Sequence, residues 1–139
     1  MTPAALAELH AQCFRVPAPF TARAFSAFLA SPHCFLCTLP HGFALGRAVA
    51  GEAELLTLAV HPDHRRAGTG RALLDGFEAT ARARDAQMAF LEVSAENAGA
   101  IALYAAAGYA ESGRRAGYYR DSDGSKCDAI LMERSLTRG

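Results

Sequence analysis

Several features that would assign a chain to a particular class of protein are missing from this sequence. Its 139 residues include no tryptophan and, among 14 basic residues, a single lysine, Lys126. Basic and acidic residues are equal in number, so net charge gives no attraction to nucleic acid or to an anionic membrane. No run reaches the roughly 20 apolar residues of a membrane helix, and the amino-terminal residues lack the basic start of a secretory signal. We therefore expect a cytoplasmic protein without nucleic-acid or membrane partners.

The four cysteines and the histidines show no spacing typical of a disulfide framework or a metal centre. Cys34 and Cys37 form a C-x-x-C pair, but they lie in a strand-like apolar run, where positions three apart point to opposite faces. His61 and His64 have no third ligand nearby in the sequence, so we interpret them as surface residues. We predict reduced, structural cysteines and no bound metal.

Length and composition predict one domain, residues 1–139, because half of the residues are apolar and a fifth are charged. Apolar periodicity and turn residues predict helices over 3–12, 22–31, 68–84 and 98–107. Strands are predicted over 35–39, 43–49, 52–60, 87–94, 109–115 and 127–135, with a polar, glycine-rich loop over 117–126. This order indicates an α+β fold with a mostly antiparallel sheet and one helical crossover between two parallel strands.

The most informative stretch, residues 55–74, combines an apolar strand, a basic turn and a helix. The strand stops before Pro62, because proline cannot donate to a sheet ladder. In the turn, Gly68 and Gly70 leave backbone N–H groups bare at the positive end of the helix dipole, and two arginines add fixed charge. On physical grounds the turn is either a tight connection or an anion site suited to a phosphate or pyrophosphate.

The helix after this turn has one apolar face, formed at three- and four-residue steps by Leu73, Leu74, Phe77 and Ala81. On its other face, Glu78 and Arg82 are four residues apart, in the favourable order for an exposed ion pair. Arg71 suits either a phosphate contact or a pair with Asp75, and we favour the pair.

Two motifs resemble those of the GCN5-related N-acetyltransferases, the GNAT family. Arg65-x-x-Gly68-x-Gly70, after a strand ending in Ala59-Val60-x-Pro62, is similar to the family's coenzyme A pyrophosphate loop and matches neither the dinucleotide fingerprint nor a Walker loop. The second motif is Asn97-x-x-x-Ile101-x-Leu103-Tyr104-x-x-x-Gly108-Tyr109. A likeness to the bacterial ribosomal-protein-alanine N-acetyltransferase branch extends from Glu52 to Met132 and includes Leu91-Glu92-Val93, Arg114-Arg115 and Gly117-Tyr118-Tyr119.

This resemblance implies the GNAT fold, a mixed and mostly antiparallel central sheet flanked by helices. It also implies direct transfer of acetyl from acetyl-CoA to the N-terminal alanine of a ribosomal protein, with Glu92 as proton acceptor and Tyr104 as proton donor to the departing sulfur. Cofactor contacts are implied for Leu58, Ala59, Val60, Arg65, Arg66, Ala67, Gly68, Thr69, Gly70 and Asn97, the last also a helix cap. Acceptor contacts are expected from Glu52, Glu54, Tyr118 and Tyr119.

The chemistry itself needs only a modest base. An N-terminal ammonium has a pKa of about 8, so a carboxylate acting directly or through water is adequate. From the residues alone, Glu92 equally suits an exposed strand face or an ion pair, and Tyr104 suits a packed core helix. Glu52 is the second choice of base. Phe14 and Phe20 suit core packing better than a pocket wall.

Three positions differ from the branch. Phe20 stands where relatives often carry tryptophan, Arg120 where a proline usually follows the tyrosines, and Thr57 where asparagine is common. These positions are expected around the acceptor rather than the cofactor. A small amine or amino acid therefore stays open as the acceptor, as does a non-catalytic acyl-CoA-binding module.

Overall fold

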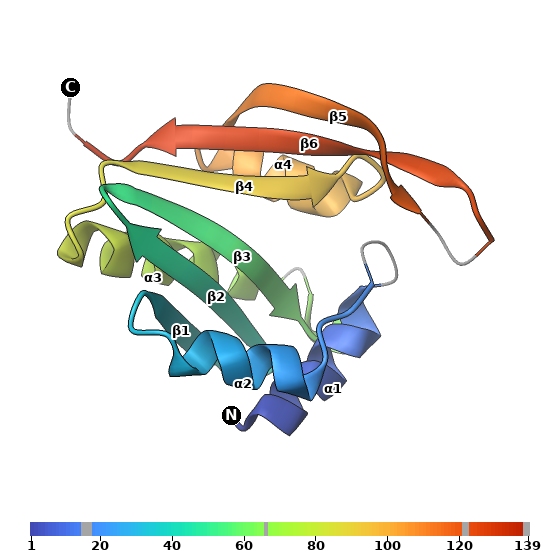
Figure 1. Ribbon diagram of the computed structural model, residues 1–139, viewed down its shortest axis with the longest axis horizontal. Coiled ribbons are helices and arrows are strands. Elements are labelled where there is room, and N and C mark those ends of the chain that lie inside the picture. Colours follow the sequence, from blue (N-terminus) through green and yellow to red (C-terminus); the bar gives the residue numbers. More distant parts are fainter. Residues whose placement is uncertain (15–17, 66, 121–122, 138–139) are drawn as a thin grey trace.

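One six-stranded sheet organises the computed structural model, which describes residues 1–14, 18–65, 67–120 and 123–137. The strands are β1 (Cys34–Leu39), β2 (Gly42–Val49), β3 (Glu52–Val60), β4 (Met88–Ser94), β5 (Ala110–Arg120) and β6 (Lys126–Ser135). Their order in the sheet is β1-β2-β3-β4-β6-β5, and only β3 and β4 are parallel neighbours (Figure 1). The predicted α+β fold with a mixed, mostly antiparallel sheet is confirmed.

Four α-helices flank the sheet: α1 (Pro3–Cys13), α2 (Ala22–Ala30), α3 (Thr69–Ala83) and α4 (Ala98–Ala106), with a short 3₁₀ helix, η1 (Pro62–His64), before α3. The predicted cap at Asn97 is confirmed, since its side chain accepts a hydrogen bond from the backbone N–H three residues on. Thr2 and Thr21 cap α1 and α2 in the same way. Gly108 follows α4 in the left-handed conformation, at φ +96°. No helix in these ranges is long and apolar enough to cross a bilayer.

The two faces of the sheet carry separate cores. On one face, α3 and α4 bury Leu74, Phe77 and Leu91 in the larger cluster. On the other face, α1 and α2 bury Leu6 and Phe25 against β2. Figure 1 shows α1 and α2 in front of the sheet and α3 and α4 behind it. Residues that alternate along β3 and β4 therefore face two different surroundings.

The parallel pair β3 and β4 separates part-way along its length. The register ends at Leu55 and Leu91, yet the two strands continue to Val60 and Ser94. Figure 1 shows them side by side at one end of the molecule and diverging toward the other. A register shift between β2 and β3 falls at the same level and leaves Leu56 unpaired. The sheet is thus split between residues 56–60 and 92–94.

The predicted loop over 117–126 is wrong in part, because β5 continues to Arg120 and β6 begins at Lys126. An irregularity in register between Arg115 and Tyr119 interrupts the pairing, after which it resumes. Gly117 lies within it at φ +59°, and its N–H donates to the Asp128 carboxylate at 2.9 Å. Polar, glycine-rich composition suggests a loop, but here it marks a bulged edge strand.

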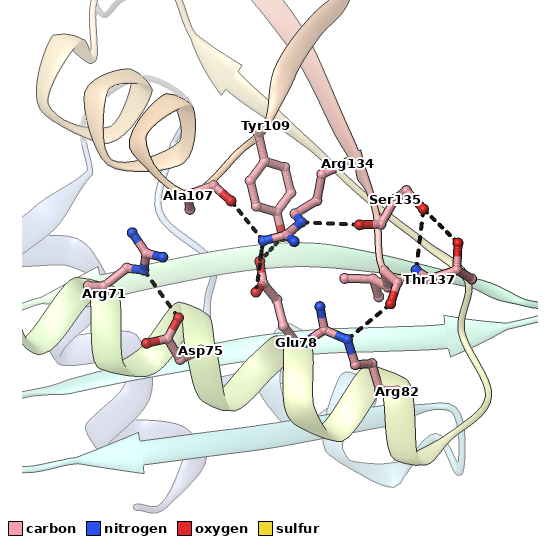
Figure 2. A network of polar contacts seen from close by, with 10 residues as sticks. Arg71, Asp75, Glu78, Arg82, Ala107, Tyr109, Arg134, Ser135 and Thr137 are labelled. Atoms are coloured by element: carbon pink, nitrogen blue, oxygen red, sulfur yellow. Dashed lines mark hydrogen bonds and ion pairs between the residues drawn. The ribbon is translucent and has the colours of Figure 1, made fainter. Parts of the chain in front are cut away.

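The predicted surface ion pair between Glu78 and Arg82 is also wrong. Glu78 is buried and accepts hydrogen bonds from the Tyr109 hydroxyl at 2.9 Å and from Arg134 Nη1 at 3.3 Å (Figure 2). Arg134 Nη1 also donates to the Ala107 carbonyl at 2.7 Å, just beyond α4. Arg82 instead donates to a backbone carbonyl near the end of β6. The covered face of α3 is wider than its apolar stripe, because α4 and β6 extend over Glu78.

Figure 2 also shows the pair between Arg71 and Asp75, whose Nε and Oδ1 atoms are 3.1 Å apart. The interpretation of these two residues as a helix-surface pair is therefore confirmed. Both side chains are exposed, with 48% and 59% of their surface accessible.

The buried carboxylate of Glu78 yields a stability prediction. Tyr109→Phe should lower the free energy of unfolding by about 1–3 kcal/mol, because it removes a hydrogen-bond donor from a buried charged group. Asp75→Ala breaks the exposed pair with Arg71 and should cost at most about 0.5 kcal/mol. Urea denaturation of the two variants measures the difference. Equal costs would contradict the structural role of Tyr109.

Candidate active site

A cavity of about 1140 Å³ lies at the split in the sheet. Its walls come from the second half of β3, the start of α3, the end of β4, α4, the end of β5 and the end of α1, together with Phe14 and Phe20. It is larger than most sites for one small ligand, which measure about 300–1,000 Å³. Of the residues that the sequence singled out, it is lined by Glu54, Leu58, Ala59, Val60, Arg65, Gly68, Thr69, Gly70, Glu92, Asn97, Tyr104, Tyr118 and Tyr119.

Among the described residues, two of the predicted site residues do not line this cavity. Glu52 lies exposed at the start of β3, on the far side of Leu55 from the split, and is not part of the wall. Ala67 is exposed in the turn before α3 and is not part of the wall. Arg66 lies outside the described residues.

The start of α3 forms one end of the cavity. Its cap residue, Gly68, has φ +81° and no side chain, so it cannot accept a hydrogen bond from the first N–H groups of the helix through a side chain. A Cβ atom built on Gly68 meets no atom within 4 Å, which leaves the approach to these donors open. Arg65 lies beside them, held by a 3.2 Å hydrogen bond from Nε to the Val60 carbonyl. Bare N–H groups and a guanidinium together suit an anionic group.

Tyr104 of α4 lines the cavity from the face of the sheet that carries α3. Burial raises the pKa of its phenol above the ordinary value, because the charged form would lose hydration. The hydroxyl has no hydrogen-bond partner among the described residues. Tyr104 is therefore a neutral donor that is free to bond a ligand in the cavity.

Glu92 of β4 reaches the cavity from the opposite face of the sheet, because its neighbours Leu91 and Val93 belong to the core under α3 and α4. The Tyr119 hydroxyl donates to Oε1 at 2.7 Å, and Arg115 Nε lies 3.5 Å from Oε2. Glu92 is thus held in an ion pair, as one interpretation of the sequence expected, and it also lines the cavity. Burial and the bond to Glu92 both raise the pKa of Tyr119.

The same side of the cavity holds a second carboxylate, Glu54. Its Oε1 atom lies 2.6 Å from Arg47 Nη2 on the neighbouring strand β2. The side chain is 27% exposed. Glu54 and Glu92 are therefore each paired with an arginine, and both face the surroundings of α1 and α2.

Sequence reasoning missed His10, the most buried polar residue in the wall. Its ring lies between Phe14 and Phe20, with centroids 4.3 and 4.7 Å away. Phe14 and Phe20 pack against the core under α1 and α2, as favoured, and also line the cavity. The available signal was the position of His10 four residues after Leu6, on the apolar face of α1.

Two hydrogen bonds determine the tautomer of His10. Its Nδ1 accepts from the Phe20 N–H at 3.0 Å, so a neutral ring carries its proton on Nε2, which lies 2.8 Å from Thr57 Oγ1. Burial lowers the pKa of His10 from 6.5 to about 4. Near neutral pH the imidazole is therefore an uncharged bridge between Phe20 and β3.

Neither metal-type nor disulfide chemistry appears among the described residues. They contain no group of three or more His, Cys, Asp or Glu side chains arranged to hold a metal ion. The four cysteines are free thiols.

A sheet split between two parallel strands, with a glycine-rich helix start at the mouth of the split, is the architecture of an acyl-coenzyme A N-acyltransferase fold. The model of the acetyltransferase (GNAT) family matches residues 4–109, and the chain belongs to this family.

Individual relatives narrow the comparison. A [ribosomal protein bS18]-alanine N-acetyltransferase of Escherichia coli K12 is 44% identical over 90 residues, which are 65% of this chain and 60% of that protein. The N-alpha-acetyltransferase RimI of Mycobacterium tuberculosis is 36% identical over 137 residues, 92% of this chain and 83% of that protein. The crystal structure of the E. coli ribosomal-protein-S18-alanine N-acetyltransferase matches with a TM-score of 0.84 at 32% identity, over 99% of this chain and 88% of that chain.

The protonation of His10 yields a pH prediction. The folded state holds the imidazole neutral, whereas the unfolded chain takes up a proton near pH 6.5, so unfolding binds protons below that value. The contribution of His10 to stability is therefore complete above pH 6.5 and declines by up to about 3 kcal/mol as the pH falls toward about 4.

Denaturation curves across this pH range measure the effect. His10→Gln should show a shallower loss of stability than the native chain, because it has no imidazole at this position. The matched change His33→Gln, at an exposed position, should keep the native slope. An unchanged slope in His10→Gln would show that the buried ring does not control this pH dependence.

Proposed function

We propose that this protein is a single-domain N-acetyltransferase of the cytoplasm. It transfers acetyl from acetyl-CoA directly to an α-amine, and its acceptor is the N-terminal alanine of a ribosomal protein. One observation carries the proposal: a single cavity connects the anion-binding start of α3, through the split in the sheet, to Glu92 and Tyr104.

The chain's own groups fit acetyl-CoA at the α3 end of this cavity. The open N–H groups after Gly68 and the guanidinium of Arg65 suit a pyrophosphate. Beyond Leu55, β3 is not paired with β4. The backbone N–H and C=O groups on this edge of β3, which point away from β2, are therefore available to an extended pantetheine chain. An N–H on this edge also suits the polarised carbonyl oxygen of a thioester. Bound here, acetyl-CoA supplies an acetyl group activated for transfer.

Glu92 and Tyr104 then divide the proton transfers between the two faces of the sheet. Glu92 takes a proton from the α-ammonium, directly or through water. The α-ammonium has a pKa of about 8, so a weak base is sufficient. Tyr104 gives its proton to the departing thiolate, whose ordinary pKa is about 8.5. Burial keeps the phenol protonated, so the hydroxyl holds its proton when the thiolate begins to form.

The acceptor approaches from the side of α1 and α2, where Glu54, Tyr118 and Tyr119 line the cavity with Glu92. Tyr118 is 53% exposed, so its ring is accessible to a peptide that enters from solvent. The E. coli relatives are alanine N-acetyltransferases of ribosomal protein bS18, and the likeness to them supports the same choice here.

An acetylation assay tests the proposal. The substrates are a peptide that begins Ala-Arg, the same peptide with a blocked amino terminus, spermidine and free alanine. We expect rapid labelling of the free peptide and none of the blocked one. If spermidine or free alanine is labelled and the peptide is not, the proposed acceptor is wrong and a small amine takes its place. If no substrate in a broad panel of amines is labelled, the protein is better explained as a non-catalytic acyl-CoA-binding module.

The role of Tyr104 gives a second, independent test. Tyr104→Phe should lower kcat by about 10²-fold or more, because a positioned acid contributes roughly 10²–10⁴ to such reactions. Acetyl-CoA should still raise the melting temperature of this variant. Tyr109→Phe also removes a buried hydroxyl but lies outside the cavity wall, so it should keep kcat within about threefold of the native value. Similar losses of kcat in the two variants would remove the argument for Tyr104 as the acid.

A further inference from the structure

The bridge between His10 and Thr57 is not used by the chemistry above, although both residues line the cavity. His10 is 2% exposed, and its two nitrogens are fully used: Nδ1 accepts from the Phe20 N–H and Nε2 donates to Thr57 Oγ1. An imidazole held this way has one tautomer and one ring orientation. It therefore presents a fixed hydrogen-bond donor to Thr57.

This donor determines what Thr57 offers to a ligand. A threonine hydroxyl has one proton and two lone pairs, and the bond from Nε2–H occupies one lone pair. Oγ1 has no other partner among the described residues, so its second lone pair remains available, as does the proton of the hydroxyl. Thr57 follows the register shift in β3, which turns its side chain toward α1. The Thr57 side chain therefore lies on the same side of the sheet as Glu92, and both residues line the cavity.

Acyl transfer from a thioester to an amine requires this kind of acceptor. An attacking nitrogen must direct its lone pair at the carbonyl carbon, and its N–H groups must then point elsewhere. One acceptor fixes one N–H and leaves the nitrogen free to rotate about that bond. Two acceptors on one side of the cavity fix the direction of the lone pair. Glu92 provides one of them, and Thr57, which lines the same cavity, has an oxygen that can serve as the second.

We propose that Thr57 is a positioning residue for the acceptor, and that Thr57 Oγ1, oriented by His10, accepts a hydrogen bond from an N–H of the attacking amine. The proposal rests on the function proposed above and refines its substrate class. A primary amine still has two N–H groups after it loses a proton, one for each acceptor. A secondary amine has one. The site therefore selects primary α-amines over N-methylated ones.

Two variants of Thr57 test the pair. Thr57→Val keeps the shape of the side chain and removes the hydroxyl, so kcat/KM for the Ala-Arg peptide should fall by about tenfold or more. The KM for acetyl-CoA should stay within about twofold, which a general structural defect would not allow. Thr57→Ser keeps the hydroxyl and should restore kcat/KM to within about threefold of the native value.

A modified peptide with N-methylalanine at its amino terminus sharpens the test. The native enzyme should prefer the unmethylated peptide, and Thr57→Val should lose about tenfold of that preference, because its site no longer uses the second N–H. The methyl group adds the same bulk in both enzymes, so the change in preference isolates the hydrogen bond.

Two substitutions of His10 test its two hydrogen bonds separately. His10→Asn places a carbonyl oxygen near Nδ1 and keeps an acceptor for the Phe20 N–H, but it has no group that reaches Thr57. His10→Gln places an amide near Nε2 and keeps a donor to Thr57. We expect His10→Asn to lower kcat/KM for the peptide in the same way as Thr57→Val, and His10→Gln to retain more activity. These variants also supply the test if Thr57→Val does not fold.

The outcomes distinguish this inference from the function on which it rests. Native turnover of the peptide, with unchanged kcat/KM and unchanged preference in Thr57→Val, overturns the positioning role and leaves the acetyltransferase assignment intact. An equal rise in the KM for acetyl-CoA overturns it as well, since Thr57 would then serve the cofactor side. Absence of native turnover with every α-amine overturns both.

Discussion

The pairing between β3 and β4 ends at Leu55 and Leu91, and most of the site follows from this interruption. A parallel pair in the middle of a sheet normally has both edges hydrogen-bonded and both faces covered. Here the two strands diverge while each stays paired on its outer side, β3 with β2 and β4 with β6. Each strand therefore remains part of the sheet through its outer neighbour, and the pairing is lost only between β3 and β4. It places open backbone groups and both faces of the sheet within reach of one ligand.

The two cores on either side of the split hold different parts of the site. The core under α3 and α4 fixes Tyr104 and also Gly70, where a Cβ atom would lie 3.3 Å from Leu103. The core under α1 and α2 fixes Phe14 and Phe20 around His10. The groups proposed to bind the cofactor and those proposed to bind the acceptor are thus supported by separate packing.

Burial controls protonation on both sides of the cavity, and it acts in opposite directions on the two kinds of group. It raises the pKa of Tyr104 and lowers that of His10, because in each case the charged form loses hydration. Both side chains are consequently neutral near physiological pH. A neutral phenol is a proton donor, and a neutral imidazole of fixed tautomer is a hydrogen-bond bridge. One physical cause therefore prepares two groups for different tasks.

The sequence by itself determined the features that depend on neighbouring residues. The caps at Thr2, Thr21 and Asn97, the glycine-rich start of α3 and the strand–turn–helix order all follow from groups a few positions apart. Only the tertiary structure decided the contacts between distant polar groups. His10 meets Thr57 across 47 positions, Tyr109 meets Glu78 across 31, and Tyr119 meets Glu92 across 27. Periodicity indicates which face of an element is apolar, but the polar groups that meet there are set by how separate elements stack and how far each one reaches.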